Sequence, residues 1–284
     1  MQLLHKKKTV TFFTVTLSLA AFCTAALWQG LAITSYTFPT EKLTAPLRVA
    51  VLTDLHSTQY GPEQSQLVTA LEQQSPDIVV LVGDIIDDKA PLSGATALFQ
   101  AIGSKFPCYY VTGNHEWRRE DVSTLWPILE EYGIHILSGT CEQITVQGQT
   151  ICLCGVDDPS SFVNSNLQYN SAYKSWTEQL NACRLQAEED QLTILLSHRP
   201  EYIQTYANYG FHLILSGHAH GGQVRLPGLV NGLFAPGQGF FPQYAGGSYT
   251  IENSTLIVSR GLCRNSLPRV FNRPEIVIVN LTPP

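Results

Sequence analysis

Polar side chains of types that bind divalent metal ions follow five separate hydrophobic runs of this chain. Each run has the length and composition of a buried strand; the runs are Val49–Leu52, Ile78–Val82, Tyr109–Val111, Ile194–Leu196 and Leu213–Leu215. The polar clusters that end them are Asp54-Leu55-His56, Gly83-Asp84, Gly113-Asn114-His115-Glu116, Ser197-His198 and Gly217-His218-Ala219-His220. Open α/β sheets bind ligands beyond the carboxyl ends of their strands, so we expect these side chains to gather at one sheet edge.

Two of the clusters have a spacing that suits joint coordination of one ion. Residues two apart in an extended segment point the same way, so Asp54 can act with His56, and His218 with His220. With three further residues, the predicted metal ligands are Asp54, His56, Asp84, Asn114, His198, His218 and His220. One tetrahedral zinc ion needs about four donors, so this larger set suits two ions that share a carboxylate.

Two ions about 3.5–4 Å apart form the arrangement that proteins use to hydrolyse phosphoesters. Oxygen and nitrogen ligands without thiolate favour manganese, iron or zinc over copper(I) or an iron–sulfur cluster. We therefore predict two divalent metal ions as cofactors. A zinc peptidase or amidohydrolase is disfavoured, because the chain has no His-Glu-x-x-His motif.

The elements that must position these clusters alternate between strands and helices in the first half of the chain. The expected order is strand 48–53, helix 62–74, strand 78–82, helix 95–102, strand 108–111 and helix 124–132. The second half adds two hairpins, which turn at Gln147-Gly148-Gln149 and at Asn253-Ser254. We predict an α/β fold in the form of a four-layer αββα sandwich, with two mixed sheets flanked by helices.

The N-terminus differs in composition from the rest. Lys6, Lys7 and Lys8 precede the uncharged run Val10–Leu31, and a bilayer core needs roughly 20 apolar residues as helix. The run predicts one transmembrane helix, a single-pass protein of the cell membrane and, from the lysines, an extracytoplasmic catalytic domain. A cleaved signal peptide ending near Thr24-Ala25-Ala26 and a buried soluble helix are the alternatives. The predicted divisions are an anchor or signal segment over 1–33, a linker with two prolines over 34–46 and a catalytic domain over 47–284.

Composition bounds the remaining possibilities. Of 284 residues, 44% are hydrophobic and 14% charged, so a large core is expected and disorder is not. The net charge of −6 argues against a duplex nucleic-acid partner, which would need a basic face.

Of the seven cysteines, Cys152 and Cys154 share one strand face, and no zinc-site spacing occurs. We expect mostly buried free thiols, with disulfides as the alternative. The oligomeric state is not predicted.

The five clusters, in this order, resemble those of the calcineurin-like metallophosphoesterases, from about Leu47 to the C-terminus. Three further segments resemble a narrower branch of membrane-anchored or exported bacterial phosphodiesterases, some of them related to UDP-2,3-diacylglucosamine hydrolases. These segments are Gly221-Gly222-Gln223, Ser259-Arg260-Gly261 and Arg273-Pro274-Glu275-Ile276. His212 departs from the family, which often has an acidic residue at that place.

The resemblance implies a role for each candidate residue. The first ion would be bound by Asp54, His56 and His220, and the second by Asn114, His198 and His218, with Asp84 as the bridge. His115 would be catalytic, by hydrogen bonding a phosphoryl oxygen or protonating the leaving group. A water shared by the two cations would lose a proton near neutral pH and supply a bridging hydroxide nucleophile.

Other polar residues near the clusters are expected to play lesser parts. Asp87, Asp88, Asp157 and Asp158 are interpreted as capping residues or as residues that orient ligands. Arg118, Arg119 and Arg199 are expected on the solvated surface. For Arg260, a place on that surface and contact with a substrate phosphate are expected equally. Trp117 and Tyr244 are expected in the core, with a pocket wall as the alternative.

The predicted substrate is a phosphodiester or pyrophosphate. An anchor near a membrane suits a lipid-linked or cell-envelope molecule, and the resemblance suggests a UDP-diacylglucosamine type. The alternative function is a scaffold or binding protein at the membrane that has this fold but no activity. Such proteins usually lack one or more metal donors, and this chain has all seven.

Overall fold

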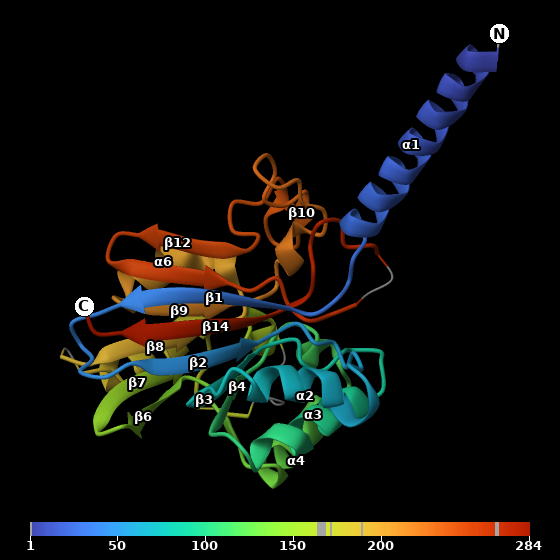
Figure 1. Cartoon of the computed structure of the whole chain (residues 1–284). Helices are drawn as coiled ribbons and strands as arrows, with labels where there is room; N and C mark the ends of the chain where they lie inside the picture. Colours follow the sequence, from blue (N-terminus) through green and yellow to red (C-terminus); the bar gives the residue numbers. More distant parts are fainter. Residues whose placement is uncertain (1, 164–168, 171, 189, 265–266) are drawn as a thin grey trace.

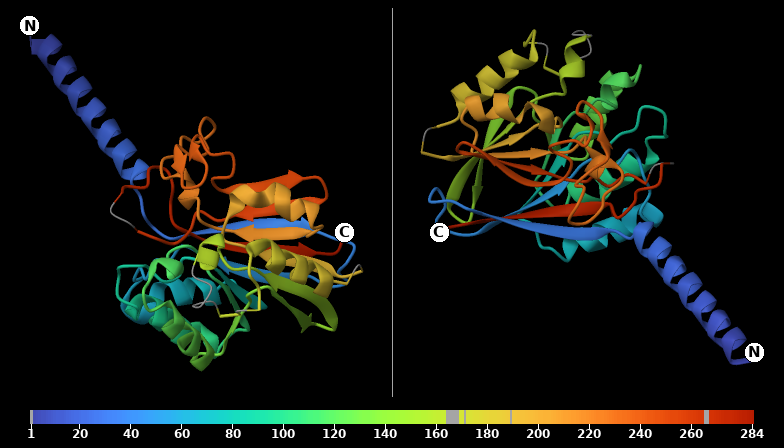
Figure 2. Two further views of the ribbon diagram at one scale, coloured as in Figure 1. Left: turned by 180° about the vertical axis from the view of Figure 1, so that it is seen from behind. Right: turned by 90° about the horizontal axis from the view of Figure 1, so that it is seen from above.

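The structure is a computed structural model that describes residues 2–163, 169–170, 172–188, 190–264 and 267–284. Two six-stranded sheets lie face to face in it (Figures 1 and 2). The first has the order β1 (Ala32–Pro39), β14 (Glu275–Thr282), β2 (Leu47–Leu52), β3 (Ile78–Val82), β4 (Cys108–Val111) and β5 (Ile134–Ile136). The second has the order β12 (Gly247–Ile251), β13 (Ser254–Val258), β9 (Leu213–Ser216), β8 (Leu192–Leu196), β7 (Gln149–Gly155) and β6 (Thr140–Val146).

Both sheets are mixed, as predicted. In the first, only the β14–β2 pair is antiparallel, and in the second the antiparallel pairs are the terminal hairpins β12–β13 and β6–β7. The central strands β3, β8 and β9 are buried on both faces and almost entirely apolar, with Thr193 and Ser216 as the polar residues, as expected for parallel strands between covering layers. Their parallel run brings the carboxyl ends of β2, β3 and β4, and of β8 and β9, to the same side of the molecule.

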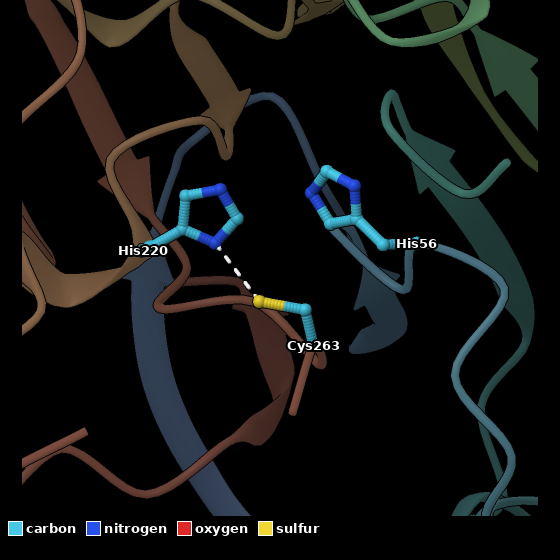
Figure 3. Close-up of side chains that lie close together, drawn as sticks. All are labelled: His56, His220 and Cys263. Atoms are coloured by element: carbon cyan, nitrogen blue, oxygen red, sulfur yellow. Dashed lines mark hydrogen bonds between the residues drawn. The ribbon is translucent and has the colours of Figure 1, made fainter. Parts of the chain in front are cut away.

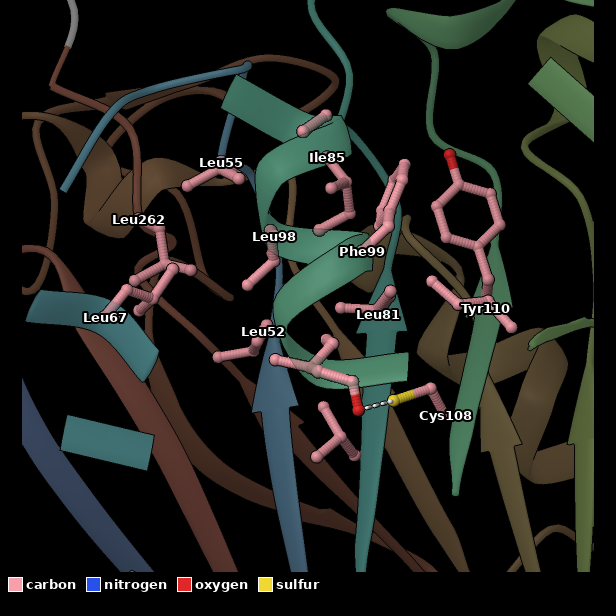
Figure 4. Close-up of a cluster of buried hydrophobic side chains, with 14 of the residues drawn as sticks. Leu52, Leu55, Leu67, Leu81, Ile85, Leu98, Phe99, Cys108, Tyr110 and Leu262 are labelled. Atoms are coloured by element: carbon pink, nitrogen blue, oxygen red, sulfur yellow. Dashed lines mark hydrogen bonds between the residues drawn. The ribbon is translucent and has the colours of Figure 1, made fainter. Parts of the chain in front are cut away.

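Helices cover the outer face of each sheet. The first sheet is covered by α2 (Ser65–Glu72), α3 (Ser93–Gly103) and α4 (Leu125–Glu131), and the second by α5 (Trp176–Gln186) and α6 (Ile203–Asn208). Short 3₁₀ helices lie at Pro62–Gln64, Glu116–Arg118, Val122–Thr124, Pro159–Val163, Pro200–Tyr202 and His220–Gly222, and a small strand pair at β10 (Phe234–Ala235) and β11 (Gly239–Phe240). Leu98 and Phe99 of α3 pack on Leu52 and Leu81 of the strands beneath (Figure 4). A separate apolar core, including Val80 and Ile194, fills the space between the two sheets.

Helix α1 (Gln2–Ala26) projects away from the body of the molecule (Figure 1). Within the residues described above, no helix has both the length and the apolar character needed to cross a membrane, so the predicted transmembrane helix is not confirmed. The helix stops at Ala26, short of the predicted end at Leu31, because the chain turns there toward β1. The Gln29 amide donates to the Arg269 carbonyl in this turn, at 2.9 Å. Phe13 and Leu17 are 67% and 73% exposed, which also disagrees with the alternative of a buried helix.

The predicted linker over 34–46 is wrong for its first part. Residues 32–39 form β1, which pairs with β14 from Ala32↔Glu275 to Pro39↔Thr282. Its exposure alternates along the whole strand, as expected for an edge strand with one covered face. Pro39 suggested a break in structure, but proline is tolerated on an edge strand, where the missing N–H has no ladder partner to lose.

The cysteines agree only in part with the expectation of buried free thiols. Cys108, Cys152, Cys183 and Cys263 are buried and not in disulfides. Cys141 and Cys154, however, form a disulfide across the β6–β7 pair, where they lie directly opposite each other. Sequence separation does not show this pairing, because it depends on the register of the hairpin.

Candidate metal centre

The loops that follow β2, β3, β4, β8 and β9 meet at one edge and bring the predicted ligands together. Backbone hydrogen bonds join them: Asp54 N–H donates to the Gly83 carbonyl at 3.0 Å, and Gly217 N–H to the His198 carbonyl at 3.2 Å. Several of the ligand residues have positive φ angles, among them Asp54 at 50° and Asp84 at 51°. Such backbone conformations are costly for residues other than glycine, and they persist where the surrounding structure holds side chains at a site.

Asp84 lies at the centre of the cluster and is almost fully buried. Its Oδ1 accepts a hydrogen bond from the backbone N–H of His115 at 2.8 Å. Its Oδ2 faces three imidazoles: Nε2 of His198 at 3.1 Å, Nε2 of His56 at 3.8 Å and Nε2 of His115 at 4.0 Å. A carboxylate surrounded in this way is in the position that a bridge between two ions requires.

Asp54 occupies a second, buried position, beside the imidazoles of His198 and His220. Its Oδ1 is 3.6 Å from Nε2 of His220 and 3.9 Å from Nε2 of His198. Both of its oxygens also accept from the backbone N–H of His218, at 3.1 Å. Asp54 thus lies between the cluster after β2 and the cluster after β9, although the two are far apart in sequence.

Four ligand atoms of this centre are buried and form no hydrogen bond of regular geometry: His56 Nε2, Asp84 Oδ2, Asn114 Oδ1 and His198 Nε2. Two of them, Asp84 Oδ2 and His198 Nε2, form an ion pair with each other at 3.1 Å, and the other two have no hydrogen-bond partner. Leaving a buried polar atom unsatisfied costs about 1–3 kcal/mol, so folded proteins rarely gather such atoms without a reason. Four of the seven predicted ligands have such an atom, and two of these atoms, Nε2 of His56 and Nε2 of His198, face the third, Oδ2 of Asp84. The residues fit a pair of divalent cations, which would satisfy these atoms.

The electrostatics of the centre favour positive charge next to Asp84. Burial alone would raise the pKa of Asp84, but His198, His56 and His115 outweigh it and hold the pKa well below its usual range. Burial lowers the pKa of His198. The negative charges of Asp84 and then of Asp54 have the larger effect and raise this pKa to about 10. A bound divalent cation would supply the positive charge that a proton on His198 supplies otherwise.

The ring nitrogens that face away from Asp84 have their own partners. Nδ1 of His56 is 3.2 Å from Asp87 Oδ2, and Nδ1 of His198 is 2.8 Å from the Val82 carbonyl. Partners of this kind fix the orientation and tautomer of an imidazole and leave Nε2 for a metal. Asp87 therefore has the orienting role that the sequence suggested for it.

His115 lies beside His56, with ring centroids 4.3 Å apart and the rings perpendicular. Its Nδ1 is 2.7 Å from Asp88 Oδ1, and its Nε2 is 2.9 Å from Nη1 of Arg118. Burial lowers the pKa of His115, against the opposing effect of Asp84. Arg118 is exposed, as expected, and it also contacts this candidate catalytic residue.

A pocket of about 270 Å³ opens beside these residues. It is lined by His56, Thr58, Asp87, Ala90, His115, His220, Cys263 and Arg264. The guanidinium of Arg264 lies 4.2 Å from the centre of the Tyr60 ring, which holds a positive charge at the pocket. Neither Cys263 nor Arg264 was selected as a site residue from the sequence. They lie on the loop after β13, a strand that runs parallel to β9.

Glu116 is a carboxylate that joins two loops of the centre, and no role was assigned to it from the sequence. It is buried, and its Oε2 accepts from the backbone N–H groups of Asp84 at 3.1 Å and Gly113 at 2.9 Å, while its Oε1 accepts from Ile86 N–H at 3.0 Å. It thereby ties the loop after β3 to the loop after β4. Burial and then Asp84 raise its pKa to about 7. Its position in the sequence, directly after His115, is the feature that could have identified it.

Arg199 and Arg260 have partners that were not expected from the sequence. Arg199 is not a surface residue; it pairs with Asp158 at 3.2 Å, and its Nη1 lies 3.0 Å from Nε2 of His218. Arg260 points elsewhere and pairs with Glu275 through its Nε at 2.8 Å. His212, the departure from the family, accepts from the backbone N–H of Thr193 at 3.1 Å, at the amino-terminal end of β8.

Gly217 allows the closest approach in the centre. A Cβ at this position would lie 2.0 Å from Thr53 Oγ1 and 2.5 Å from Asp54 Oδ2, which is closer than side chains pack. We predict that Gly217→Ala displaces Asp54 and weakens binding of the first ion, at an overpacking cost of about 1–3 kcal/mol. Competition with a chelator measures the effect. Gly148→Ala, at a turn with no atom within 4 Å of the new Cβ, is the control; equal metal affinity of the two variants would contradict the prediction.

Comparison with known proteins places this geometry in a family. The sequence profile of the calcineurin-like phosphoesterases matches residues 47–222. A "Transmembrane protein with metallophosphoesterase domain" from Bos taurus is 30% identical over 93% of this chain and 59% of its own length. Its counterpart in Danio rerio is 27% identical, over 97% of this chain and 63% of its own length. The chain therefore spans about three fifths of the length of these two relatives.

Bacterial relatives match along most of their length. The "Uncharacterized protein YpbG" of Bacillus subtilis is 26% identical over 93% of this chain and 94% of its own length. Among solved structures, the NAD nucleotidase NadN of Haemophilus influenzae superimposes with a TM-score of 0.51, at 18% identity, over 76% of this chain and 45% of its own. At this identity the likeness concerns the fold alone. With the family profile covering 47–222, the chain belongs to the calcineurin-like phosphoesterases, a family of metal-dependent phosphoester hydrolases.

Proposed function

We propose that this protein hydrolyses phosphodiester or pyrophosphate bonds with two divalent metal ions held at the centre around Asp84. The observation that carries the proposal is the group of four buried ligand atoms without a regular hydrogen bond, in which Nε2 of His56 and of His198 both face Oδ2 of Asp84. Asp54, His56 and His220 would bind one ion, Asn114, His198 and His218 the other, and Asp84 both. Bound there, the ions would activate a water molecule and polarise the phosphoryl oxygens.

The residues of the chain would then position the substrate and move the proton. His115 lies at the pocket wall, within reach of a phosphoryl oxygen or a leaving group beside Asp84. Asp88 holds Nδ1 and keeps the imidazole in one orientation. Nε2, which lies 2.9 Å from Nη1 of the exposed Arg118, would exchange that contact for the substrate oxygen. Arg264 places a cation at the same pocket, where it would attract the phosphate.

Metal analysis and a chromogenic phosphodiester test the proposal together. We expect purified protein to retain two ions per chain and to turn the diester over, and His218→Ala to lose both metal and turnover. A His218→Ala variant with unchanged metal content and unchanged turnover would exclude the two-metal centre. The rival function, an inactive scaffold of this fold, would be favoured by a well-folded protein that binds no metal and has no turnover.

We further propose a lipid-linked substrate, such as a diphosphate of the UDP-diacylglucosamine type, taken up at a membrane. A segment that directly follows the 3₁₀ helix at His220 has several exposed apolar side chains. This apolar loop comprises residues 226–241 and includes Leu229, Phe240 and Phe241, which are 85%, 72% and 68% exposed. Exposed apolar groups in such a contiguous segment are typical of surfaces that meet a membrane or a partner.

The apolar loop and α1 lie toward the same end of the molecule (Figures 1 and 2). The base of α1 is attached to the loop between β13 and β14, because Phe271 N–H donates to the Ala26 carbonyl at 2.7 Å and the Phe22 and Phe271 rings are 5.4 Å apart. A membrane that meets both α1 and the apolar loop would bring a lipid-linked phosphate to the pocket. The relatives named as transmembrane proteins support this proposal.

Binding to lipid vesicles tests the apolar loop. We expect the full chain to cosediment with phosphatidylethanolamine–phosphatidylglycerol vesicles, and the double change Phe240→Ser with Phe241→Ser to weaken binding at least tenfold. Burial of one phenylalanine side chain contributes about 1.5–3 kcal/mol, and tenfold corresponds to about 1.4 kcal/mol. Leu185→Ser, at an 87% exposed leucine on α5, is the matched control. Equal binding by both variants would remove the loop from the proposal.

A further inference from the structure

We propose that Cys263 is a positioning residue of the metal centre: its sulfur accepts a hydrogen bond from Nδ1–H of His220 and thereby aims Nε2 of that ring at the first ion. This inference rests on the proposed two-metal function. It concerns a residue outside the five polar clusters, on the loop between β13 and β14. Figure 3 shows the sulfur beside His220, with the His56 ring on the other side of the space between them.

The two nitrogens of His220 face different partners. Nδ1 is 3.1 Å from Sγ of Cys263, whereas Nε2 is 3.6 Å from Oδ1 of Asp54. The His220 and His56 rings lie at a small angle to each other, with centroids 5.2 Å apart. Nε2 of His220 is therefore the nitrogen available to an ion that Asp54 also binds, and Nδ1 is the nitrogen that the sulfur holds.

The same device recurs at two other imidazoles of the centre. Nδ1 of His56 lies against the Asp87 carboxylate, and Nδ1 of His198 lies against the Val82 carbonyl. In both, Nε2 faces the carboxylate of Asp84. His220 follows this pattern, except that its second partner is a sulfur atom and not an oxygen atom.

The loop that contains Cys263 is built to hold His220 in place. Arg269 is buried, and its guanidinium donates to the carbonyl oxygens of Cys263 at 3.0 Å and Asn272 at 2.8 Å. Asn272 in turn donates its side-chain amide to the His220 carbonyl at 2.7 Å. The backbone of His220 and its ring are thus held by one loop. Nη1 of Arg269 also lies 3.9 Å from Cys263 Sγ, and this cation beside the sulfur favours its role as an acceptor.

The geometry favours positioning over direct ligation. A tetrahedral zinc ion bound to sulfur at about 2.3 Å and to nitrogen at about 2.0 Å would hold the two atoms roughly 3.5 Å apart. The observed separation of 3.1 Å is shorter, and it involves the nitrogen that does not face Asp54. A hydrogen bond from Nδ1–H to the sulfur accounts for both facts.

Metal titration of full-length variants tests the proposal. Protein stripped of metal is titrated with Zn²⁺ against a competing chelator, for the wild type, Cys263→Ala, Cys263→Ser and the control Cys108→Ala. Cys108 is also buried and outside a disulfide, but its sulfur lies near the Ile102 carbonyl, under α3. We expect Cys263→Ala to weaken the binding of one of the two ions about 10–100-fold, as loss of an orienting partner does at other metal sites. Cys263→Ser keeps an acceptor and is expected to restore most of that affinity, while Cys108→Ala leaves both ions unchanged.

Two spectroscopic measurements separate positioning from a general structural role. In metal-free protein labelled with ¹⁵N-histidine, where no ion fixes the tautomer, we expect the proton of neutral His220 on Nδ1 in the wild type and a mixture of the two tautomers in Cys263→Ala. In Co²⁺-loaded protein, we expect no sulfur-to-cobalt charge-transfer absorption that depends on Cys263.

Three results would overturn the inference. Full affinity for both ions in Cys263→Ala shows that the sulfur does not position His220, and a cobalt–sulfur band that disappears in Cys263→Ser shows that it is a ligand instead. Wild-type protein that binds fewer than two ions overturns the proposed function and this inference with it. The first two results leave the proposed function intact, so the failures are distinguishable.

Discussion

Replacement of Asp84 by asparagine is expected to lower phosphodiester turnover about 10³-fold or more. The change keeps the shape of the side chain and the hydrogen bond from His115 N–H to Oδ1. It removes the negative charge that faces His56, His115 and His198 and that would bridge two cations. Lewis-acid stabilisation by a metal contributes several kcal/mol to such reactions, and each 1.4 kcal/mol corresponds to about tenfold in rate.

The measurement is kcat on a chromogenic phosphodiester together with the metal content of each preparation. Asp121→Asn is the control, because Asp121 is an exposed carboxylate paired with Arg119 at 2.8 Å. We expect the control to keep two ions and full turnover. Asp84→Asn with two tightly bound ions and turnover near that of the wild type would exclude Asp84 as the bridge.

The second large effect is on stability. Binding of an ion at a concentration about 1,000 times its Kd stabilises the folded state by about 4 kcal/mol. For a chain of this size, each kcal/mol raises Tm by roughly 2–4 °C, so we expect saturating Mn²⁺ or Zn²⁺ to raise Tm by roughly 10 °C. The physical reason is that the cations would satisfy ligand atoms that are buried without partners, such as Asn114 Oδ1 and His56 Nε2.

Thermal unfolding monitored by circular dichroism, with chelator and with added metal, tests this expectation. In Asp84→Asn most of the increase should disappear, whereas Asp121→Asn should show the full increase. The same shift in all three proteins would mean that the cations bind elsewhere, and no shift in the wild type would mean that the centre does not bind them.

Much of the architecture was predictable because hydrophobic periodicity follows directly from burial. The all-apolar runs over 78–82 and 213–215 became central strands β3 and β9, and the turns at 147–149 and 253–254 became hairpins. The edge strand β1 was missed, because its pairing with β14, at the other end of the chain, depends on contacts that no local pattern records. The Cys141–Cys154 disulfide was missed for the same reason.

At the metal centre, residue types and their positions after strands were enough to select the candidates. Polar side chains that end buried parallel strands must emerge at one edge, and the structure brings Asp54, Asp84, His56, His198 and His220 within a few ångströms of one another. The residues that orient these ligands were less accessible to sequence reasoning. Asp87 and Glu116 lie close to the clusters in sequence, but their partners are set by how neighbouring loops pack.

The sequence by itself determined the fold class, the edge where polar groups collect and the type of metal that suits them, since these depend on composition and on the two-residue period of strands. The tertiary structure decided which nitrogen of each imidazole faces Asp84 or Asp54, and that Arg199 contacts His218 while Arg260 pairs with Glu275. It also brought Cys263 to His220, 43 residues apart in the chain. Such contacts depend on the packing of two sheets and the loops between them, where a shift of one ångström changes the partner.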